Sequence, residues 1–486
     1  MLRVIVLVVW VMLLQHEGLS QKRQTDTLAP NIIFIVADDL GWADVGYNGS
    51  TLYKTPNIDK LAGLGIVFNC AYSASPVCSP SRAALLTGKH PVQTDITDYI
   101  PGDRHYGPHT HQKLASQPFA MQLPLAEHTL AEALKKAGYR TFFAGKWHLG
   151  ENENFGPLQH GFDKNLGGNH TGHPAGGYFS PYQNPQLPDG PNGEYLTDRL
   201  TDETMAFIRQ NDNRPFFAFM PYYSVHLPLQ GKPDTVEKYR QLLTKKKAVS
   251  EVFEKNGDTY SKLVQNNPQY AAMVESLDEN IGRLMNFLQT EGLARNTIII
   301  FTSDNGGMST SNAKEQIPTS NLPLRAGKGY LYEGGIRVPL VISWQANLKG
   351  GQHTNFPVSG MDFYPTLLQL AGLPPMPQQH IDGISLVPLL SGKSLAVRSL
   401  FWHYPHYSGG LGGTPAGAVR MGRYKLIEWY ESNTIELYNL DKDAGEKVNL
   451  ATSKPQQTRK LRQMLHRWRH QVKAKMPHAN PNYKVP

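Results

Sequence analysis

Four oxygen-bearing side chains are of the types that hold metal ions. Asp38 and Asp39 follow one continuous apolar run, and Asp304 and Asn305 follow another. Carboxylate and amide oxygens suit a hard cation such as Ca²⁺ or Mg²⁺ better than zinc or copper. An Asp-Asp-Leu-Gly run can also form an ordinary turn. However, acids that met at one sheet edge without a cation would repel each other, so the two sets together predict a metal site.

Cys78 is the candidate nucleophile. It precedes the segment 79–88, which is typical of a helix with Pro80 in its first turn. The positive end of a helix favours an anionic nucleophile and an anionic substrate, and Arg82 lies one turn further on. A buried free thiol is the ordinary alternative, and the spacing also allows a disulfide with Cys70, which would exclude catalysis by Cys78. The Cys-x5-Arg spacing of thiolate phosphatases is absent at this cysteine.

Three further polar side chains follow apolar runs. Lys146 and His148 close the run 141–145, and His226 lies a few residues beyond the run 216–220. A single lysine is usually a surface charge, and a single histidine after a strand is usually a hydrogen-bonded loop residue. Their shared position after strand-like runs makes them candidates for one site.

These candidates require a scaffold that brings strand ends together. Several apolar runs are continuous and do not alternate, which indicates strands covered on both faces. They occupy residues 31–37, 216–220, 297–301 and 338–342. We therefore predict an α/β fold with a largely parallel sheet between helices, in which ligands bind beyond the carboxyl ends of the strands. One helix is marked by Thr129 and Glu132, a capping-box pattern, and by Gly138 as its stop.

The C-terminal part of the chain has a different sequence pattern from the rest. Short strand candidates at 399–403, 418–430 and 436–438 precede an amphipathic basic segment at 454–475. We predict a small α+β domain with an antiparallel sheet over residues 396–486, ending in a basic amphipathic helix.

Composition indicates a globular protein that does not depend on disulfides. The 486 residues are 40% hydrophobic and contain two cysteines, so the core must supply the stability. The net charge is +8, and eight Lys or Arg without any acid lie between Lys454 and Lys475. A charge run of this kind usually solvates one face of a helix, so we predict no nucleic-acid partner.

The first twenty residues have the pattern of a cleaved secretory signal. Arg3 is followed by the apolar stretch 4–14 and then by the small residues Gly18 and Ser20. This stretch is shorter than the roughly 20 apolar residues that span a bilayer, and no second candidate span follows. We predict a secreted or periplasmic protein without a membrane span, with a catalytic domain over residues 21–395.

Five segments of the sequence resemble signatures of the type I sulfatases. The resemblance extends over most of residues 30–395 and is carried by 78–82 with 86–88, 138–148, 304–307, 327–329 and 333–339. It implies the alkaline-phosphatase-like α/β sandwich with a smaller C-terminal domain. It also implies that a maturation enzyme oxidises Cys78 to formylglycine. One hydroxyl of its hydrate attacks the sulfur of a sulfate ester and the alcohol leaves, and the sulfated intermediate then collapses to the aldehyde and expels sulfate.

The resemblance also assigns roles to the other candidates. It implies a calcium ion, with Mg²⁺ as the second choice, held by Asp38, Asp39, Asp304, Asn305 and the modified Cys78. Lys146 and Lys328 would hold the sulfate oxygens. Arg82 and His148 would hold the hydroxyls of the formylglycine hydrate, and His226 would protonate the leaving alcohol. A sulfated carbohydrate is the expected substrate.

Two other functions are compatible with the sequence. A phosphonate monoester or phosphodiester hydrolase of the same superfamily would need similar charges in its pocket. A non-catalytic protein that binds sulfated glycans would use the basic helix as its contact surface. His170 and His173 lie in a Gly-rich stretch, and only composition connects them with a substrate pocket.

Overall fold

The computed structural model of the protein describes residues 29–102, 109–150, 152–210, 212–246 and 250–484. The predicted secretory signal at residues 1–20 lies outside these ranges. Among the described residues, no helix is both long enough and apolar enough to cross a membrane.

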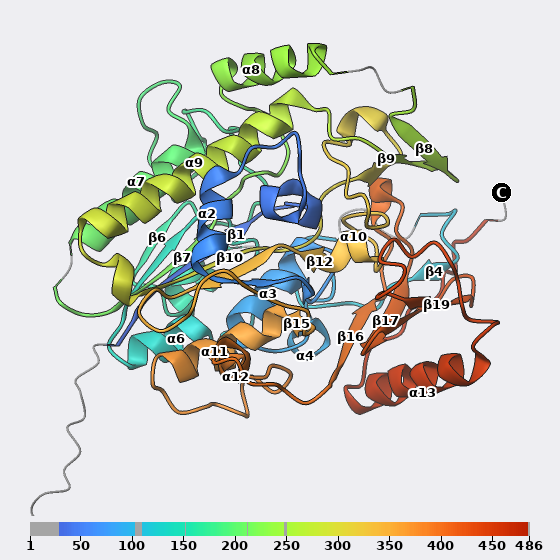
Figure 1. Cartoon of the computed structure of the whole chain (residues 1–486). Coiled ribbons are helices and arrows are strands. Elements are labelled where there is room, and N and C mark those ends of the chain that lie inside the picture. Colours follow the sequence, from blue (N-terminus) through green and yellow to red (C-terminus); the bar gives the residue numbers. More distant parts are fainter. Residues whose placement is uncertain (1–28, 103–108, 151, 211, 247–249, 485–486) are drawn as a thin grey trace, which may run out of the picture.

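An eight-stranded sheet forms the centre of the molecule (Figure 1). In spatial order the strands are β14 (Gln352–Thr354), β2 (Ile66–Phe68), β13 (Leu340–Ser343), β10 (Thr297–Ser303), β1 (Asn31–Ala37), β7 (Phe216–Pro221), β5 (Arg140–Ala144) and β6 (Lys164–Leu166). The five strands from β10 to β6 are parallel, β13 is antiparallel to β10 and β2, and β14 pairs with β2 in parallel. The prediction of a large, mostly parallel sheet is confirmed.

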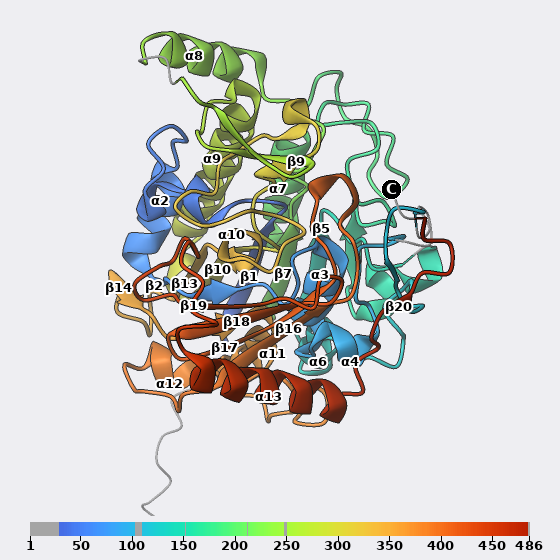
Figure 2. The same ribbon diagram turned by 90° about the vertical axis from the view of Figure 1, so that its right-hand side faces the viewer.

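Helices cover both faces of this sheet, as the continuous apolar runs predict (Figures 1 and 2). Successive residues of β1 point to opposite faces, so Ile33 and Ile35 pack in one core and Phe34 and Val36 in the other. The first core is closed by α2 (Pro56–Leu64), α7 (Leu196–Arg209) and α9 (Pro268–Thr290). The second is closed by α3 (Cys78–Thr87), α6 (Leu130–Lys136) and α11 (Phe363–Leu370).

The two helix starts predicted from the sequence are confirmed. Thr129 and Glu132 form the capping box of α6, with side-chain to backbone hydrogen bonds of 3.2 and 2.7 Å. The helix α3 begins at Cys78 and carries Pro80 in its first turn. It ends at Gly88, whose φ of +67° favours glycine.

The prediction of one strand over residues 338–342 is wrong. Val338 belongs to the two-residue strand β12 (Arg337–Val338), which pairs with β3 (Ala71–Tyr72) in a separate sheet completed by β15 (Val358–Ser359). The strand β13 begins only at Leu340. Pro339 separates them because it has no N–H to donate to a ladder.

A four-stranded antiparallel sheet and one helix make up the C-terminal part (Figure 2). One face of the sheet packs on α13 through Leu461, Leu465 and Trp468, and the other packs on Tyr72 and Tyr332 of the larger part. The antiparallel sheet and the amphipathic helix are as predicted, whereas the division of the chain at residue 395 stays a prediction. The elements are β16 (Ser399–Tyr404), β17 (Ala416–Met421), β18 (Tyr424–Trp429), β19 (Ile435–Asn439) and α13 (Pro455–Gln471).

The single strand expected over residues 418–430 is instead the hairpin β17–β18. Met421 pairs with Tyr424, and the turn between them contains Gly422 at a φ of +57°. Glycine reaches this left-handed conformation without a steric penalty, so the chain reverses there.

The smaller elements lie around these two sheets. The short strands form a three-stranded sheet, β11-β9-β8, and a two-stranded one, β20-β4. They and the remaining helices are α4 (Pro91–Thr94), β4 (Leu114–Ala115), α8 (Pro233–Thr244), β8 (Phe253–Asn256), β9 (Thr259–Lys262), β11 (Thr310–Ser311), α10 (Glu333–Ile336), α12 (Val387–Leu390) and β20 (His478–Ala479).

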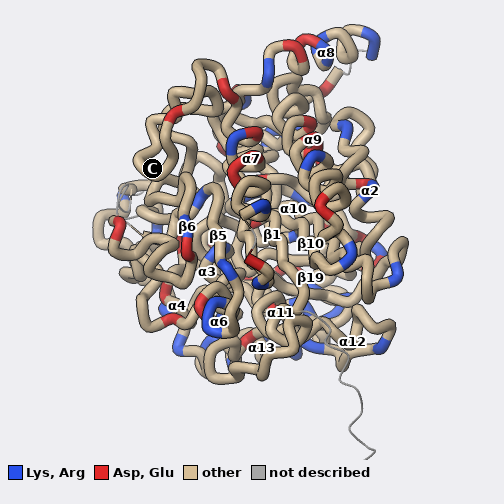
Figure 3. The backbone as a smooth tube through the Cα atoms, turned by 90° about the vertical axis from the view of Figure 1, so that its left-hand side faces the viewer, with Lys and Arg blue, Asp and Glu red and all other residues tan. Residues whose placement is uncertain are grey.

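The basic helix α13 is partly neutralised from within the protein. Arg462, His466 and Arg469 gather around the carboxylate of Glu428 in β18, at 3.0, 3.0 and 2.6 Å. Elsewhere both signs of charge are interspersed, as along α8 and α9 in Figure 3. The ion pairs with Glu428 hold α13 against its sheet.

Candidate active site

The predicted site residues meet at the carboxyl edge of the parallel strands. Asp38 and Asp39 follow β1, and Asp304 and Asn305 follow β10, its neighbour in the sheet. The backbone N–H of Asp39 donates to Asp304 Oδ1 at 3.2 Å. The four metal-ligand candidates are therefore brought together by one pair of strands.

Two lysines lie against the first two carboxylates. Lys146 follows β5, and its Nζ lies 2.8 Å from Asp38 Oδ2; Lys328 Nζ lies 2.8 Å from Asp39 Oδ2. All four side chains are buried. Burial raises the pKa of Asp38 to about 7 against the opposing charge of Lys146. Burial also acts to raise the pKa of Asp39, but Lys328 and His226 hold that pKa below its ordinary value.

Arg82 connects the helix α3 to the third carboxylate. Its Nε donates to Asp304 Oδ2 at 2.9 Å, its Nη2 lies 2.8 Å from the same oxygen in an ion pair, and its Nη1 donates to the carbonyl of Lys146 at 2.7 Å. The guanidinium is only 2% exposed. A planar fork held on two strand ends is a fixed positive charge beside the start of α3.

Cys78 and His148 form a hydrogen-bonded pair. His148 Nε2 lies 2.6 Å from the carbonyl of Ile100, and Nδ1 lies 3.3 Å from Cys78 Sγ. Because a carbonyl only accepts, Nε2 carries the proton and Nδ1 accepts from the group at position 78. Burial, and then the charge of Lys146, lower the pKa of His148 well below its ordinary value. Burial raises the pKa of the Cys78 thiol.

Both cysteines are free, so the disulfide alternative is wrong. Cys70 lies near Arg420 of β17, with Nη2 3.7 Å from its Sγ, and not beside Cys78. The thiol of Cys78 is 3% exposed and faces the candidate site.

The oxygen atoms at this edge fit a hard cation. Asp38, Asp39 and His226 each offer a ligand atom, and these atoms lie within 4.8 Å of one another. Two buried oxygens, Asp38 Oδ1 and Asn305 Oδ1, have no hydrogen-bond partner; Arg82 Nη2 is 3.6 Å from the former. A cation would satisfy these acceptors, whose loss of water is otherwise uncompensated.

His226 also belongs to this cluster, although the sequence predicts it as an acid and not as a ligand. Its Nε2 lies 3.6 Å from Asp39 Oδ2, and its Nδ1 lies 3.0 Å from the carbonyl of Leu227. Nδ1 therefore carries the proton in the neutral ring, and Nε2 is the atom near the carboxylates.

A cavity of about 480 Å³ opens onto these groups. Cys78, His148, His226 and Lys328 line it. Its walls include Tyr99, Ile100, Pro101, the stretch 170–173, Tyr404, Ser408 and Leu411. A volume in this range suits a small-molecule site.

His170 and His173 line this cavity, a position that only their composition connected with a substrate pocket in the sequence. The signal that would have found them is the short parallel strand β6, which ends at Leu166, because residues after a parallel strand reach the same sheet edge. Tyr404 and Ser408 had no such signal, because they come from the antiparallel C-terminal sheet and the loop after it.

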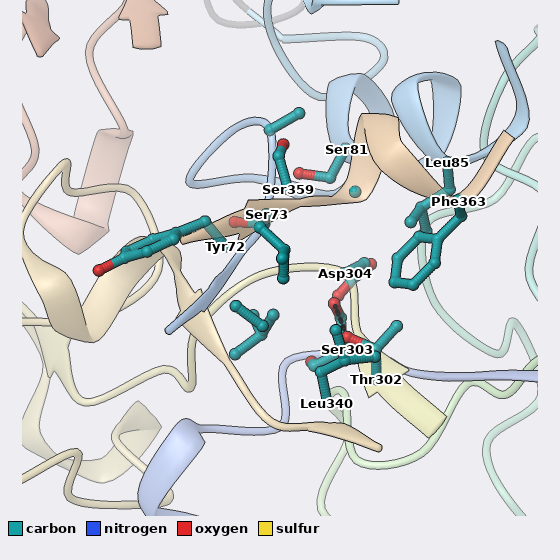
Figure 4. A pocket seen from close by; sticks show the side chains of 15 residues that line it. Tyr72, Ser73, Ser81, Leu85, Thr302, Ser303, Asp304, Leu340, Ser359 and Phe363 are labelled. Carbon is teal, nitrogen blue, oxygen red and sulfur yellow. Dashed lines mark hydrogen bonds between the residues drawn. The ribbon is translucent and has the colours of Figure 1, made fainter. Parts of the chain in front are cut away.

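Serines and apolar side chains pack around Asp304 on the inner side of the site (Figure 4). Ser81 of α3 donates to the carbonyl of Ser75 at 2.9 Å, and Ser303 donates to that of Asn305 at 2.9 Å. Ser81, Ser303 and Asp304 line an internal cavity of about 10 Å³, close to the space of one water molecule. Little free space therefore lies behind Asp304, so its carboxylate is held in place.

Comparison with known proteins agrees with this geometry. The family model "Sulfatase" matches residues 30–373, and a model of the C-terminal region of N-sulphoglucosamine sulphohydrolase matches residues 326–475. Mouse N-acetylgalactosamine-6-sulfatase is 32% identical over 455 residues, which are 88% of this chain and 78% of the mouse protein. A sulfatase of Formosa agariphila is 32% identical over 519 residues, covering 90% and 87% of the two chains.

A solved structure agrees over the same range. The crystal structure of Ps i-CgsB has a TM-score of 0.73 and 30% identity, covering 90% of this chain and 92% of the other. With its family model across residues 30–373 and its relatives matched over most of both chains, the chain belongs to the sulfatase family of sulfuric ester hydrolases.

Proposed function

We propose that the protein is a secreted sulfatase that hydrolyses sulfate esters of a carbohydrate, with formylglycine formed from Cys78 as its nucleophile. The observation that carries this proposal is the convergence of Cys78, at the start of α3, with the buried cations Arg82, Lys146 and Lys328. Three fixed positive charges around one small group suit a tetrahedral anion.

The environment of Cys78 supports its conversion. Burial raises the pKa of the thiol, and His148 Nδ1 accepts its hydrogen bond, so the unmodified residue is protonated and a weak nucleophile. Formylglycine would supply a hydrated aldehyde in place of the thiol. Because Ile100 fixes the tautomer of His148, Nδ1 is placed to accept a proton from a hydroxyl at position 78.

The lysines hold charge where the sulfate oxygens must sit. Lys146 and Lys328 are each fixed by a carboxylate at 2.8 Å, so they lose little freedom when a substrate binds. His226 is the proposed proton donor to the leaving alcohol in its protonated form, because its Nε2 faces the same carboxylate edge and donates only when both ring nitrogens carry protons.

Asp38, Asp39, Asp304 and Asn305, with an oxygen of the modified residue 78, would hold a calcium ion. The unpartnered oxygens of Asp38 and Asn305 support this ligand set. The ion would supply a Lewis acid for a sulfate oxygen.

Carbohydrate is the proposed substrate class. One relative is named for N-acetylgalactosamine 6-sulfate, and Ps i-CgsB has been solved with a neocarrahexaose. A cavity of about 480 Å³ admits a sugar unit together with its sulfate.

Two measurements test the proposal. Mass spectrometry of the peptide containing Cys78, from a host with the maturation enzyme, should detect an aldehyde. The same protein should release sulfate from 4-nitrophenyl sulfate faster than it cleaves a 4-nitrophenyl phosphodiester. An unmodified thiol in fully active protein would refute the mechanism, and a preference for the phosphodiester would favour the phosphonate or phosphodiester hydrolase. If Cys78→Ala kept all measured function, the non-catalytic glycan-binding function would replace both.

A further inference from the structure

A second cavity, of about 620 Å³, lies behind the turn that carries Lys328. The hairpin β8–β9, the strand β11 and the segment 321–332 form its walls, near α10 in Figure 1. Lys328 faces the active-site cavity, whereas Arg325 and Tyr330 of the same segment line the second one. One turn of the chain therefore separates the two cavities.

The loop 408–413 forms the other part of this partition. Ser408 and Leu411 line the active-site cavity. Gly412 packs against Thr259 and Tyr330, which line the second cavity. A Cβ added at Gly412 would come within 2.2 Å of Thr259 and 2.6 Å of the Tyr330 hydroxyl. The loop 408–413 therefore contacts residues of both cavities.

Lys262 is a buried ammonium in the wall of the second cavity. It is 6% exposed, and its Nζ donates to the carbonyls of Ile317 and Pro318 at 3.1 and 3.3 Å. Within the described ranges, no Asp or Glu oxygen lies within 4.0 Å of this Nζ, so the charge has no counter-ion there. An ammonium has three donors, and the two carbonyls account for two. A buried charge without a counter-ion is costly, and an anionic ligand would offset that cost.

The other lining residues agree with a negatively charged ligand. Arg325 donates to the hydroxyl of Tyr438 and the carbonyl of Glu446, and it makes no carboxylate ion pair in the described part of the chain. The Thr310 hydroxyl is buried without a hydrogen-bond partner. Lys447 is exposed at the rim.

Two tyrosines and two acids also line the cavity. Tyr330 and Tyr332 line it with their ring centroids 6.2 Å apart, and the Arg325 guanidinium lies 3.9 Å from the centroid of the Tyr332 ring. Of the two acids that line it, Glu446 is bound to Lys425 at 2.9 Å, and Glu254 lies on the exposed strand β8.

We propose that this cavity is a second subsite, which binds a carboxylate or sulfate on a sugar unit beyond the one whose sulfate is hydrolysed. The inference rests on the proposed function, because it takes the substrate to be an anionic polysaccharide. It predicts that the protein binds long chains better than short ones, with Lys262, Arg325 and Lys447 contributing to the difference.

The test is calorimetric binding of two probes to the full chain carrying Cys78→Ala, which stops turnover. Chondroitin 6-sulfate carries carboxylates and sulfates, whereas ι-carrageenan carries sulfates alone. With hexasaccharides, Lys262→Met should weaken binding about tenfold, the size of one lost charged hydrogen bond, and should leave disaccharide binding within twofold. A loss with both probes assigns the site to sulfate, and a loss with chondroitin sulfate alone assigns it to carboxylate.

Two further variants distinguish a lost ligand contact from a folding defect. Lys447→Gln changes an exposed side chain and should weaken hexasaccharide binding several-fold at an unchanged melting temperature. Lys255→Met, on β8 but outside the cavity, is the matched control and should change nothing. Equal losses for di- and hexasaccharides, or no hexasaccharide binding at all, would overturn the second subsite. Turnover of 4-nitrophenyl sulfate by the unsubstituted protein tests the proposed function separately.

Discussion

Lys425 is the residue whose removal we expect to destabilise the protein most clearly. It lies on β18, fully buried, with its Nζ 3.0 Å from Glu333 and 2.9 Å from Glu446. Glu333 begins α10, and its backbone N–H donates to Glu446 at 2.6 Å. One ammonium therefore joins the C-terminal sheet to the helix that follows the Lys328 turn.

The size of the effect follows from the two carboxylates. Lys425→Met leaves them buried without their shared ammonium, and breaking a buried pair in this way costs about 3–5 kcal/mol. In the unsubstituted protein the two carboxylates already repel each other. Burial and the neighbouring Glu333 raise the pKa of Glu446 to about 7, although Lys425 acts to lower it. In contrast, Lys425 and the nearby arginines hold the pKa of Glu333 low despite its burial.

The pH dependence has a defined sign. Because the folded-state pKa of Glu446 exceeds the unfolded value of 4.5, this group contributes stability below pH 4.5 and loses it as the pH rises to about 7. That rise corresponds to about 3 kcal/mol, at about 1.4 kcal/mol per tenfold change in proton affinity. Lys425→Met should therefore cost more at pH 8, where both carboxylates must ionise, than at pH 5.

Urea unfolding followed by tryptophan fluorescence at pH 5 and pH 8 measures both effects. Glu446→Gln combined with Lys425→Met should recover part of the loss and flatten its pH dependence. Lys442→Met, on the exposed surface, is the control. A loss below about 1 kcal/mol at pH 8, or the same loss at both pH values, would show that the buried ammonium does not act as described.

Three further outcomes are expected. Gly172→Ala should lower kcat by up to about a hundredfold, because the new Cβ would meet the His148 ring at 2.6 Å; Gly63→Ala, with no atom within 4 Å, is the control, and unchanged kcat would exclude that contact. Thr129→Ala should lower the free energy of unfolding by about 1 kcal/mol through loss of the α6 cap, and no change in the urea midpoint would contradict it. Excess EGTA should abolish sulfate release and added Ca²⁺ should restore it, whereas full activity in the chelator would refute the calcium site.

Much of the scaffold was predictable because burial leaves a strong local signal. The continuous runs that became β1, β7 and β10 lie between two helical layers, so no residue in them needs to be polar. The predictions failed where the signal is a single residue. Pro339 divides one apolar run between two sheets, and Gly422 turns one strand into a hairpin.

The sequence by itself predicted most of the candidate site residues, because they follow a recognisable strand or lie at the start of a recognisable helix, whereas Lys328 was predicted only from the resemblance to the sulfatases. It also predicted the chemistry through the residue types gathered there. Only the tertiary structure decided how those groups pair, which tautomer His148 adopts, and that His170, Tyr404 and Ser408 share their cavity. The reason is physical: a strand end is a local property of the chain, whereas a pairing or a cavity wall depends on segments hundreds of residues apart.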